Sequence, residues 1–200
     1  MRVRAAALID FQGERLAARY IDRVQSVWAA ERRVTDRTDL SEAVARGLFK
    51  FTAYKDEYEV ARLLVDPTFL DEVRAQVPGG EQLTYRLHPP VLRALGRTKK
   101  IGFGPKSHAA LRILAKGKRL RGTRLDPFGY AHVRKVERAL LAHYTATVDR
   151  LAADLDADTY DRAVQVAVLP DAVRGYEDVK LRTVEQYRAR LAELGVEIDF

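Results

Sequence analysis

The chain of 200 residues contains no cysteine. This absence excludes disulfide bonds, thiolate zinc sites, cysteine nucleophiles and cysteine-ligated iron–sulfur clusters within the chain. The chain also has no apolar stretch that approaches the roughly 18 residues of a membrane-spanning helix, so we expect no membrane contact. The first ten residues hold an apolar run too short for a secretory signal. Together these features lead us to expect a cytoplasmic protein.

Familiar catalytic and metal-binding motifs are missing as well. The sequence has no GxGxxG, GxxxxGK[ST] or GxSxG string, and its four histidines show no HExxH spacing. His132 and His143 are eleven residues apart, which separates them by roughly 16 Å on a helix, so they cannot bind one metal together. We therefore predict no metal site and no catalytic residue in this chain.

Acidic residues are absent from Gln82–Leu125, a segment that carries twelve lysines and arginines. Because the net charge of the whole chain is only +7, the remaining residues sum to −5. The positive charge is thus one local field, which attracts a nucleic acid, a phosphate-bearing cofactor or an acidic protein surface. The candidate anion-binding residues are the cations that cluster in this segment: Lys99, Lys100, Lys116, Lys118 and Arg119.

Hydrophobic periodicity indicates a mainly α fold. Apolar residues at steps of three and four, with capping residues and proline or glycine breaks, predict helices over about 10–33, 39–65, 67–77, 105–119, 126–155, 159–168 and 176–194. Alternation in Leu83–His88, with Lys99–Phe103 as a partner, predicts a short two-stranded β ribbon around residues 83–103. We expect a bundle-like single domain over residues 1–200, with a basic insertion or arm at about 82–125.

Two segments, residues 45–63 and 120–130, are denser in aromatic and charged residues than packing requires. In the first, Phe51, Tyr54 and Tyr58 share one side of the predicted helix. The simpler interpretation of this pattern is an aromatic core stripe beside ordinary surface ion pairs.

An acid–base hypothesis for the first segment uses Lys55 as its central group, with Asp56, Glu57, Tyr54 and Tyr58 as further acid–base groups. It requires burial of Lys55, because an exposed lysine stays protonated. An exposed Lys55 paired with Glu59 would remove its motivation, and Glu59 can also pair with Arg62 at i,i+3.

In the second segment, Asp126 precedes proline and is interpreted as a helix cap. Phe128 and Tyr130 are interpreted as core anchors.

Both segments resemble the C-terminal helical region of the long, fused-chain indolepyruvate ferredoxin oxidoreductases. The strings ARGLFKFTAYKDEYEVARL and LRGTRLDPFGY carry the similarity, and weaker similarity extends through FQGERLAARYIDRV, YRLHPPVL, ERALLAHY and VLPDAVRGYEDVK. The resemblance thus covers nearly the whole chain. Its motifs are specific to that region without being catalytic signatures.

Enzymes of that family oxidatively decarboxylate aryl 2-oxo acids to acyl-CoA with thiamine diphosphate and iron–sulfur chemistry, and they pass electrons to ferredoxin. Their Gly-Asp-Gly thiamine motif and their cluster cysteines are missing here, and the family members are several times longer. The resemblance therefore implies an accessory, non-catalytic module, with both cofactors held only by partner domains.

Such a module would pack on the catalytic domains of the oxidoreductase, or on a second copy of itself, and offer its basic surface to coenzyme A or ferredoxin. The candidate interface residues come from the two segments: Tyr54, Lys55, Asp56, Glu57, Tyr58, Arg121, Asp126, Phe128 and Tyr130.

The alternative hypothesis is a nucleic-acid-binding helical module that uses the basic segment 86–124. Tyr85, Phe103 or Phe128 would then stack on bases. The sequence has no helix-turn-helix, zinc-finger or RNP-type signature, so nucleic acid is the less favoured partner.

Overall fold

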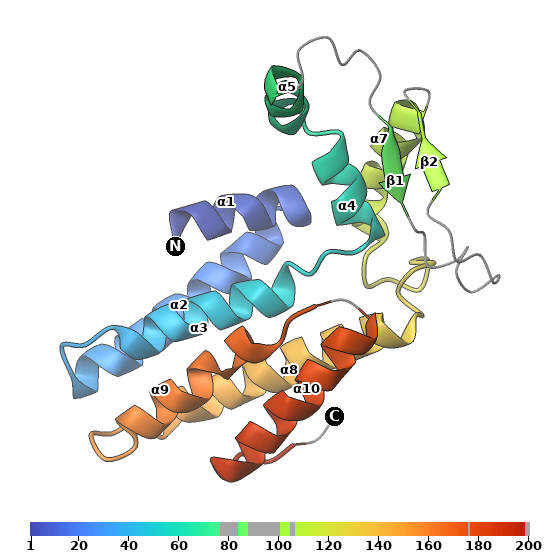
Figure 1. The fold of residues 1–200 in the computed structure, drawn as a ribbon. Coiled ribbons are helices and arrows are strands. Elements are labelled where there is room, and N and C mark those ends of the chain that lie inside the picture. The colour runs from blue at the N-terminus through green and yellow to red at the C-terminus, as the bar shows by residue number, and fades with distance from the viewer. Residues whose placement is uncertain (77–83, 88–100, 105–106, 176, 199–200) are drawn as a thin grey trace. The chain divides into compact units, whose positions relative to one another are not determined.

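The structure, a computed structural model, describes residues 1–76, 84–87, 101–104, 107–175 and 177–198 (Figure 1). The chain forms two compact units. We call Met1–Tyr54 with Gly129–Phe200 the helical unit, and Lys55–Phe128 the inserted unit. The inserted unit is therefore longer than the segment 82–125 that the charge distribution indicates.

The mainly α fold class is confirmed. The helical unit contains α1 (Arg2–Phe11), α2 (Glu14–Val34), α3 (Asp39–Thr52), α8 (His132–Ala153), α9 (Tyr160–Val168), the 3₁₀ turn η2 (Leu169–Ala172) and α10 (Glu177–Glu193). The inserted unit contains α4 (Glu57–Leu64), α5 (Pro67–Gln76), β1 (Tyr85–Leu87), β2 (Ile101–Phe103), α7 (Ser107–Lys116) and the 3₁₀ turn η1 (Gly117–Leu120).

Two of the predicted helices are interrupted. The helix predicted over 10–33 is confirmed from Glu14 onward as α2, but its start is wrong, because α1 begins at Arg2 and the chain breaks at Gly13, whose φ of 133° favours glycine. The helix predicted over 39–65 divides into α3 and α4, so Phe51 and Tyr58 do not share a helix. In both cases the apolar periodicity continues across the break. The position of the break depends on local backbone geometry, which the periodicity does not reveal.

The helix predicted from Asp126 begins later, at His132. Asp126 is therefore not its cap, and the carboxylate has other hydrogen-bond partners, described below. The cap-plus-proline prediction is confirmed for α5, where Asp66 Oδ1 accepts from Thr68 N at 2.9 Å and Phe69 N at 3.3 Å.

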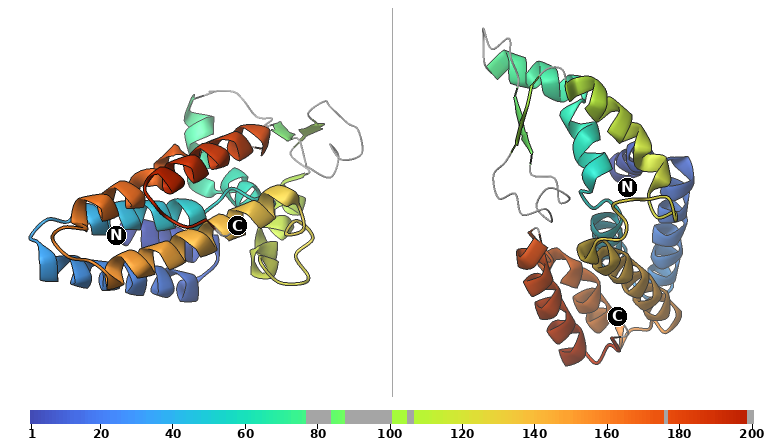
Figure 2. Two further views of the ribbon diagram at one scale, coloured as in Figure 1. Left: turned by 90° about the horizontal axis from the view of Figure 1, so that it is seen from below. Right: turned by 90° about the vertical axis from the view of Figure 1, so that its right-hand side faces the viewer.

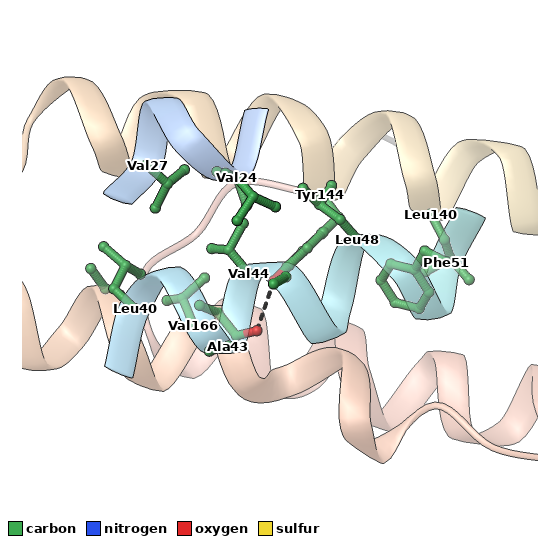
Figure 3. Close-up of a cluster of buried hydrophobic side chains, with 14 of the residues drawn as sticks. Val24, Val27, Leu40, Ala43, Val44, Leu48, Phe51, Leu140, Tyr144 and Val166 are labelled. Atoms are coloured by element: carbon green, nitrogen blue, oxygen red, sulfur yellow. Dashed lines mark hydrogen bonds between the residues drawn. The ribbon is translucent and has the colours of Figure 1, made fainter. Parts of the chain in front are cut away.

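The core of the helical unit is centred on α3, which packs against α2, α8 and α9 (Figures 1 and 3). Its buried side chains recur at steps of three and four and contact one continuous apolar cluster. In Figure 3, Leu40, Val44, Leu48 and Phe51 of α3 lie among residues of the neighbouring helices. Trp28 of α2 is 48% exposed and does not belong to this core.

Small residues let α8 approach α3. Tyr144 of α8 is fully buried, donates its hydroxyl proton to Ala167 O at 2.8 Å, and contacts the ring of Phe51 edge-on. A Cβ atom at Gly47 would lie 2.7 Å from Cζ and 2.9 Å from Cε1 of Tyr144. Glycine at position 47 is therefore required by this close approach rather than by an unusual backbone conformation.

A buried carboxylate caps the first turn of α3. Glu31 of α2 accepts hydrogen bonds from Leu40 N at 2.8 Å and Ser41 N at 3.0 Å. Its Oε1 also accepts from the Tyr160 hydroxyl at 2.8 Å. These bonds satisfy amide groups that a helix start leaves without partners, and they tie α2, α3 and α9 together. Although Asp39 and Glu42 have the spacing of a capping box, the first amides of α3 are bound by this longer-range cap.

The chain after α10 folds back against the helical unit. Gly195, at φ 66°, ends the last helix as predicted, and Val196 N donates to Leu191 O at 2.9 Å. Glu197 O then lies 2.8 Å from Nε2 of the buried His143.

The inserted unit has a smaller core. α4 packs along α7, as the right-hand view of Figure 2 shows, and Ala61, Leu70 and Leu111 form its buried cluster. β1 and β2 pair antiparallel with Tyr85 opposite Phe103, so the ribbon lies where the alternation predicts it.

The Gly47→Ala variant tests the contact between α3 and α8. Alanine favours a helix by about 1 kcal/mol, but the new methyl group overlaps the Tyr144 ring, which its hydrogen bond and full burial hold in place. We expect a net loss of about 1–2 kcal/mol in the free energy of unfolding, measured by urea denaturation. Gly104→Ala is the control, because nothing lies within 4 Å of a Cβ atom there. A stabilised Gly47→Ala variant would contradict this packing.

The Tyr160→Phe variant tests the cap. Burial, followed by the hydrogen bond to Glu31, raises the pKa of Tyr160 to about 12 from 10.0. The folded state thus holds this proton more tightly, so the stability contribution is complete below pH 10 and is lost as pH rises through 12. We expect Tyr160→Phe to lower stability at neutral pH by about 1.5–3 kcal/mol. It should also flatten the alkaline decline between pH 10 and 12, measured by urea denaturation across pH. Tyr130→Phe, at an exposed ring, should keep the parental slope.

Candidate functional site

Parts of the two segments that the sequence singles out, residues 55–63 and 120–128, meet in the inserted unit. Asp56 precedes α4 in extended conformation, and its Oδ1 accepts from Glu59 N at 2.8 Å as the helix cap. Arg121, 65 residues later, donates from Nε to Oδ2 at 2.5 Å and from Nη2 to Oδ1 at 2.8 Å. Both side chains are almost fully buried. The result is a two-point ion pair in the interior, a geometry that arginine favours with carboxylates.

A second carboxylate organises the loop after η1. Asp126 Oδ1 accepts from the Tyr58 hydroxyl at 3.0 Å and from Phe128 N at 3.2 Å, and its Oδ2 accepts from Gly122 N at 3.1 Å. Three donors from two segments thus satisfy one buried carboxylate. We call Asp56, Tyr58, Arg121 and Asp126 the buried network.

Tyr58 joins the two carboxylate centres. The Arg121 guanidinium lies 5.7 Å from the centre of the Tyr58 ring, and Phe128 meets that ring edge-on at 5.2 Å. Burial and the hydrogen bond to Asp126 raise the Tyr58 pKa far above its ordinary value, against a smaller opposing effect of Arg121. Tyr58 therefore remains a neutral donor at physiological pH and is unsuited to act as a base.

The backbone near η1 is fitted to the same ring. A Cβ atom at Gly117 would lie 2.7 Å from Cε1 of Tyr58. Within the network the Arg121 guanidinium neutralises the Asp56 carboxylate, and three uncharged donors satisfy the Asp126 carboxylate. The arrangement holds the loop 121–128 against the start of α4, and it positions no ionised group toward solvent.

The other candidate interface residues lie outside the network. Tyr54 belongs to the helical unit, where it meets Phe11 edge-on at 5.9 Å and lies 5.6 Å below the Arg134 guanidinium. Lys55 is exposed and Glu57 is half-buried. Tyr130 is 63% exposed, so the prediction that it anchors the core is wrong. Phe128 is half-buried against Tyr58, as a packing role requires.

The acid–base hypothesis loses its motivation. It requires a buried Lys55, and this lysine is exposed. Glu59 pairs with Arg62, whose Nη2 lies 2.7 Å from Glu59 Oε1. Of the two pairings that the sequence allows for Glu59, the structure records the one at i,i+3.

The candidate anion-binding residues divide between described and undescribed parts of the chain. Lys99 and Lys100 lie outside the described residues. Lys116 at the end of α7 and Arg119 in η1 are exposed, and Lys118 is half-buried.

Neither a metal cluster nor a membrane span is found in the part of the chain that the structure describes. There, no three His, Asp or Glu side chains are grouped to hold a metal ion. Likewise, none of the described helices has the length and apolarity needed to cross a bilayer.

Two buried carboxylates escaped the sequence analysis. Glu31 follows Tyr20, Val24 and Val27 at helical spacing, so its position on the buried face of α2 was visible in the sequence. Glu137 occupies the buried face of α8, where it binds Arg134 at 2.7 Å and also the Lys180 ammonium. An acidic residue inside an apolar stripe was the available signal for both.

The fold and the buried network define a mainly helical protein in which an inserted unit carries a loop locked by buried carboxylates. The chain belongs to the Family of unknown function (DUF6537), whose model matches residues 1–193. No curated protein and no solved structure matches the chain.

The Arg121→Met variant tests the network. Removing the guanidinium leaves the Asp56 carboxylate buried without its charge partner, which costs about 3–5 kcal/mol in known cases. We expect a loss of this size by urea denaturation, and partial recovery in the Asp56→Asn/Arg121→Met double variant. Arg74→Met breaks an exposed pair with Asp71 and should change stability by less than about 0.5 kcal/mol. Equal effects of the two single variants would contradict a structural role for the buried pair.

Proposed function

We propose that the protein is an accessory, non-catalytic module of a 2-oxo acid:ferredoxin oxidoreductase of the indolepyruvate type, and that it works in the cytoplasm. Thiamine diphosphate and the iron–sulfur cluster are held by partner domains. The module packs on those catalytic domains and presents its basic segment to an anionic partner, coenzyme A or ferredoxin.

The observation that carries the proposal is that the two family-like segments build the buried network. The strings ARGLFKFTAYKDEYEVARL and LRGTRLDPFGY supply Asp56, Tyr58, Arg121 and Asp126, the four members of the buried network. Their similarity to the oxidoreductase region is thus concentrated where it maintains structure. This is the pattern expected of a module whose family signature is a folding requirement.

The chemistry of the network supports a docking role over a catalytic one. Tyr58 is a neutral donor, and both carboxylates are engaged by donors inside the protein. Contacts with a partner must then come from side chains outside the network. Tyr130 in the helical unit is one such side chain, since an aromatic ring at 63% exposure is a frequent contact residue at interfaces.

Nucleic acid remains the competing partner for the basic segment. Of the aromatic residues considered for base stacking, Phe128 is half-buried against Tyr58, which makes its ring a poor platform. Random DNA and RNA in a gel-shift series separate the two hypotheses, since nucleic-acid binding falls steeply with salt.

Co-purification tests the proposed function. We expect the full chain to retain the thiamine-binding and cluster-binding polypeptides of a 2-oxo acid:ferredoxin oxidoreductase at about 0.05 M salt, and less of them at about 0.5 M. Tyr130→Ser should weaken this association by about five- to tenfold, the range of an exposed aromatic contact. Val179→Ser, at another exposed position of the helical unit, serves as the control. Absence of association at low salt would contradict the proposal.

A further inference from the structure

The inserted unit presents exposed aliphatic side chains along α7, η1 and the turn that follows. Ile113 is 73% exposed, whereas Leu111, two residues earlier, is buried in the unit's core. Leu125 is 75% exposed and Leu120 is 38% exposed. Single exposed aliphatic residues are common on proteins, so these three alone indicate no function.

Exposed cations accompany these aliphatic side chains. Arg112, Lys116 and Arg119 are exposed, and no carboxylate of the described residues forms an ion pair with them. The segment that holds them, Gln82–Leu125, contains no acidic residue, whereas Arg23 of the helical unit pairs with Asp149 at 3.0 Å. We call Arg112, Ile113, Lys116, Arg119, Leu120 and Leu125 the basic–apolar ridge. On α7, Arg112 and Ile113 lie one turn before Lys116, which places all three on adjoining parts of one helix face.

The turn that carries Leu125 is fixed by hydrogen bonds. Leu120 O accepts from Thr123 N at 2.9 Å and from Thr123 Oγ1 at 2.7 Å. Leu125 N then donates to Thr123 Oγ1 at 3.2 Å, and Asp126 N donates to Thr123 O at 3.2 Å. Because Asp126 is itself locked in the buried network, the backbone under Leu125 is already ordered. Binding of a partner over Leu125 therefore costs little conformational entropy for ordering this loop.

The composition of the ridge selects among anionic partners. Cations without a carboxylate partner among the described residues favour a negatively charged surface, and the aliphatic side chains of the ridge favour a surface that also carries apolar groups. The ridge offers no aromatic side chain on which a base could stack. Its three aliphatic residues are fewer than an interfacial membrane helix inserts into a bilayer. Charge complementarity and apolar content together fit a protein.

We propose that the basic–apolar ridge is a docking surface for an acidic protein segment that carries at least one aliphatic or aromatic side chain between its carboxylates. The carboxylates pair with Arg112, Lys116 and Arg119, and the apolar side chain covers Ile113 or Leu125. This inference rests on the proposed function only in treating the chain as a docking module, and it adds the partner chemistry and the residues that recognise it.

The test uses the full chain and two fluorescein-labelled helical peptides, read by fluorescence anisotropy. One peptide carries glutamates with leucines at i,i+3 and i,i+4 spacing, and the other has serine in place of each leucine. We expect the leucine peptide to bind at least about fivefold more tightly, and both to weaken between about 0.05 M and 0.5 M salt.

Variants assign the binding to the ridge. Ile113→Ser/Leu125→Ser should remove the preference for the leucine peptide and leave the weak binding of the serine peptide. Arg112→Gln/Lys116→Gln should weaken both peptides by about three- to tenfold at low salt. All four positions are exposed, so these variants should fold. The matched controls in the helical unit, Val179→Ser and Lys135→Gln, should change neither affinity.

Several outcomes would overturn the proposal. They are equal affinity for the two peptides, ridge variants that bind as the parent does, and tighter binding of single-stranded DNA or phosphatidylserine vesicles than of the leucine peptide. Self-association through the ridge, seen as a sedimentation shift that the ridge variants abolish, would assign the surface to a second copy and also overturn it. The peptide assay does not use the oxidoreductase polypeptides. Its result can therefore be interpreted even if the co-purification fails.

Discussion

The buried ion pair between Asp56 and Arg121 is the constraint on which the inserted unit depends. A carboxylate and a guanidinium removed from water must face each other at hydrogen-bonding distance, since either charge alone would be strongly destabilising there. Meeting this condition brings the start of α4 to the end of η1, across 65 residues of chain. The hydrogen bonds of Asp126 then follow, because the loop that carries it begins at Arg121 and is already placed beside Tyr58.

Buried carboxylates play a comparable part in the helical unit. Glu31 caps α3 and binds Tyr160, so three helices share one charged group. Glu137 draws Lys180 of α10 to α8. An apolar core can be repacked in several ways, whereas a buried charge tolerates few arrangements of its donors. These groups therefore select one packing of helices whose apolar faces alone would permit others.

The sequence predicts the parts of this structure that depend on local pattern. Helical class, the α5 cap at Asp66, the stop at Gly195 and the position of the β ribbon follow from residues close together in the chain. The breaks at Gly13 and before Asp56 were missed, because hydrophobic spacing continues across them. The network was missed for a different reason. In the local sequence, Asp56 is an acidic residue beside a lysine, and Arg121 is one more cation of a basic segment. Their contact depends on the tertiary fold, and its only sequence signal was the unusual density of aromatic and charged residues in the two segments.

The inserted unit separates its charges into two environments with different consequences. Arg121, a cation of the segment 82–125, is neutralised in the interior by Asp56, a carboxylate from outside that segment. Arg112, Lys116 and Arg119 remain at the surface, beside aliphatic side chains that the small core of the unit does not use. Burial of one charge thus fixes the backbone, and the fixed backbone holds the exposed charges at set positions. A surface ordered in this way recognises the pattern of a partner's charges, because the positions of its own charges are determined before the partner arrives.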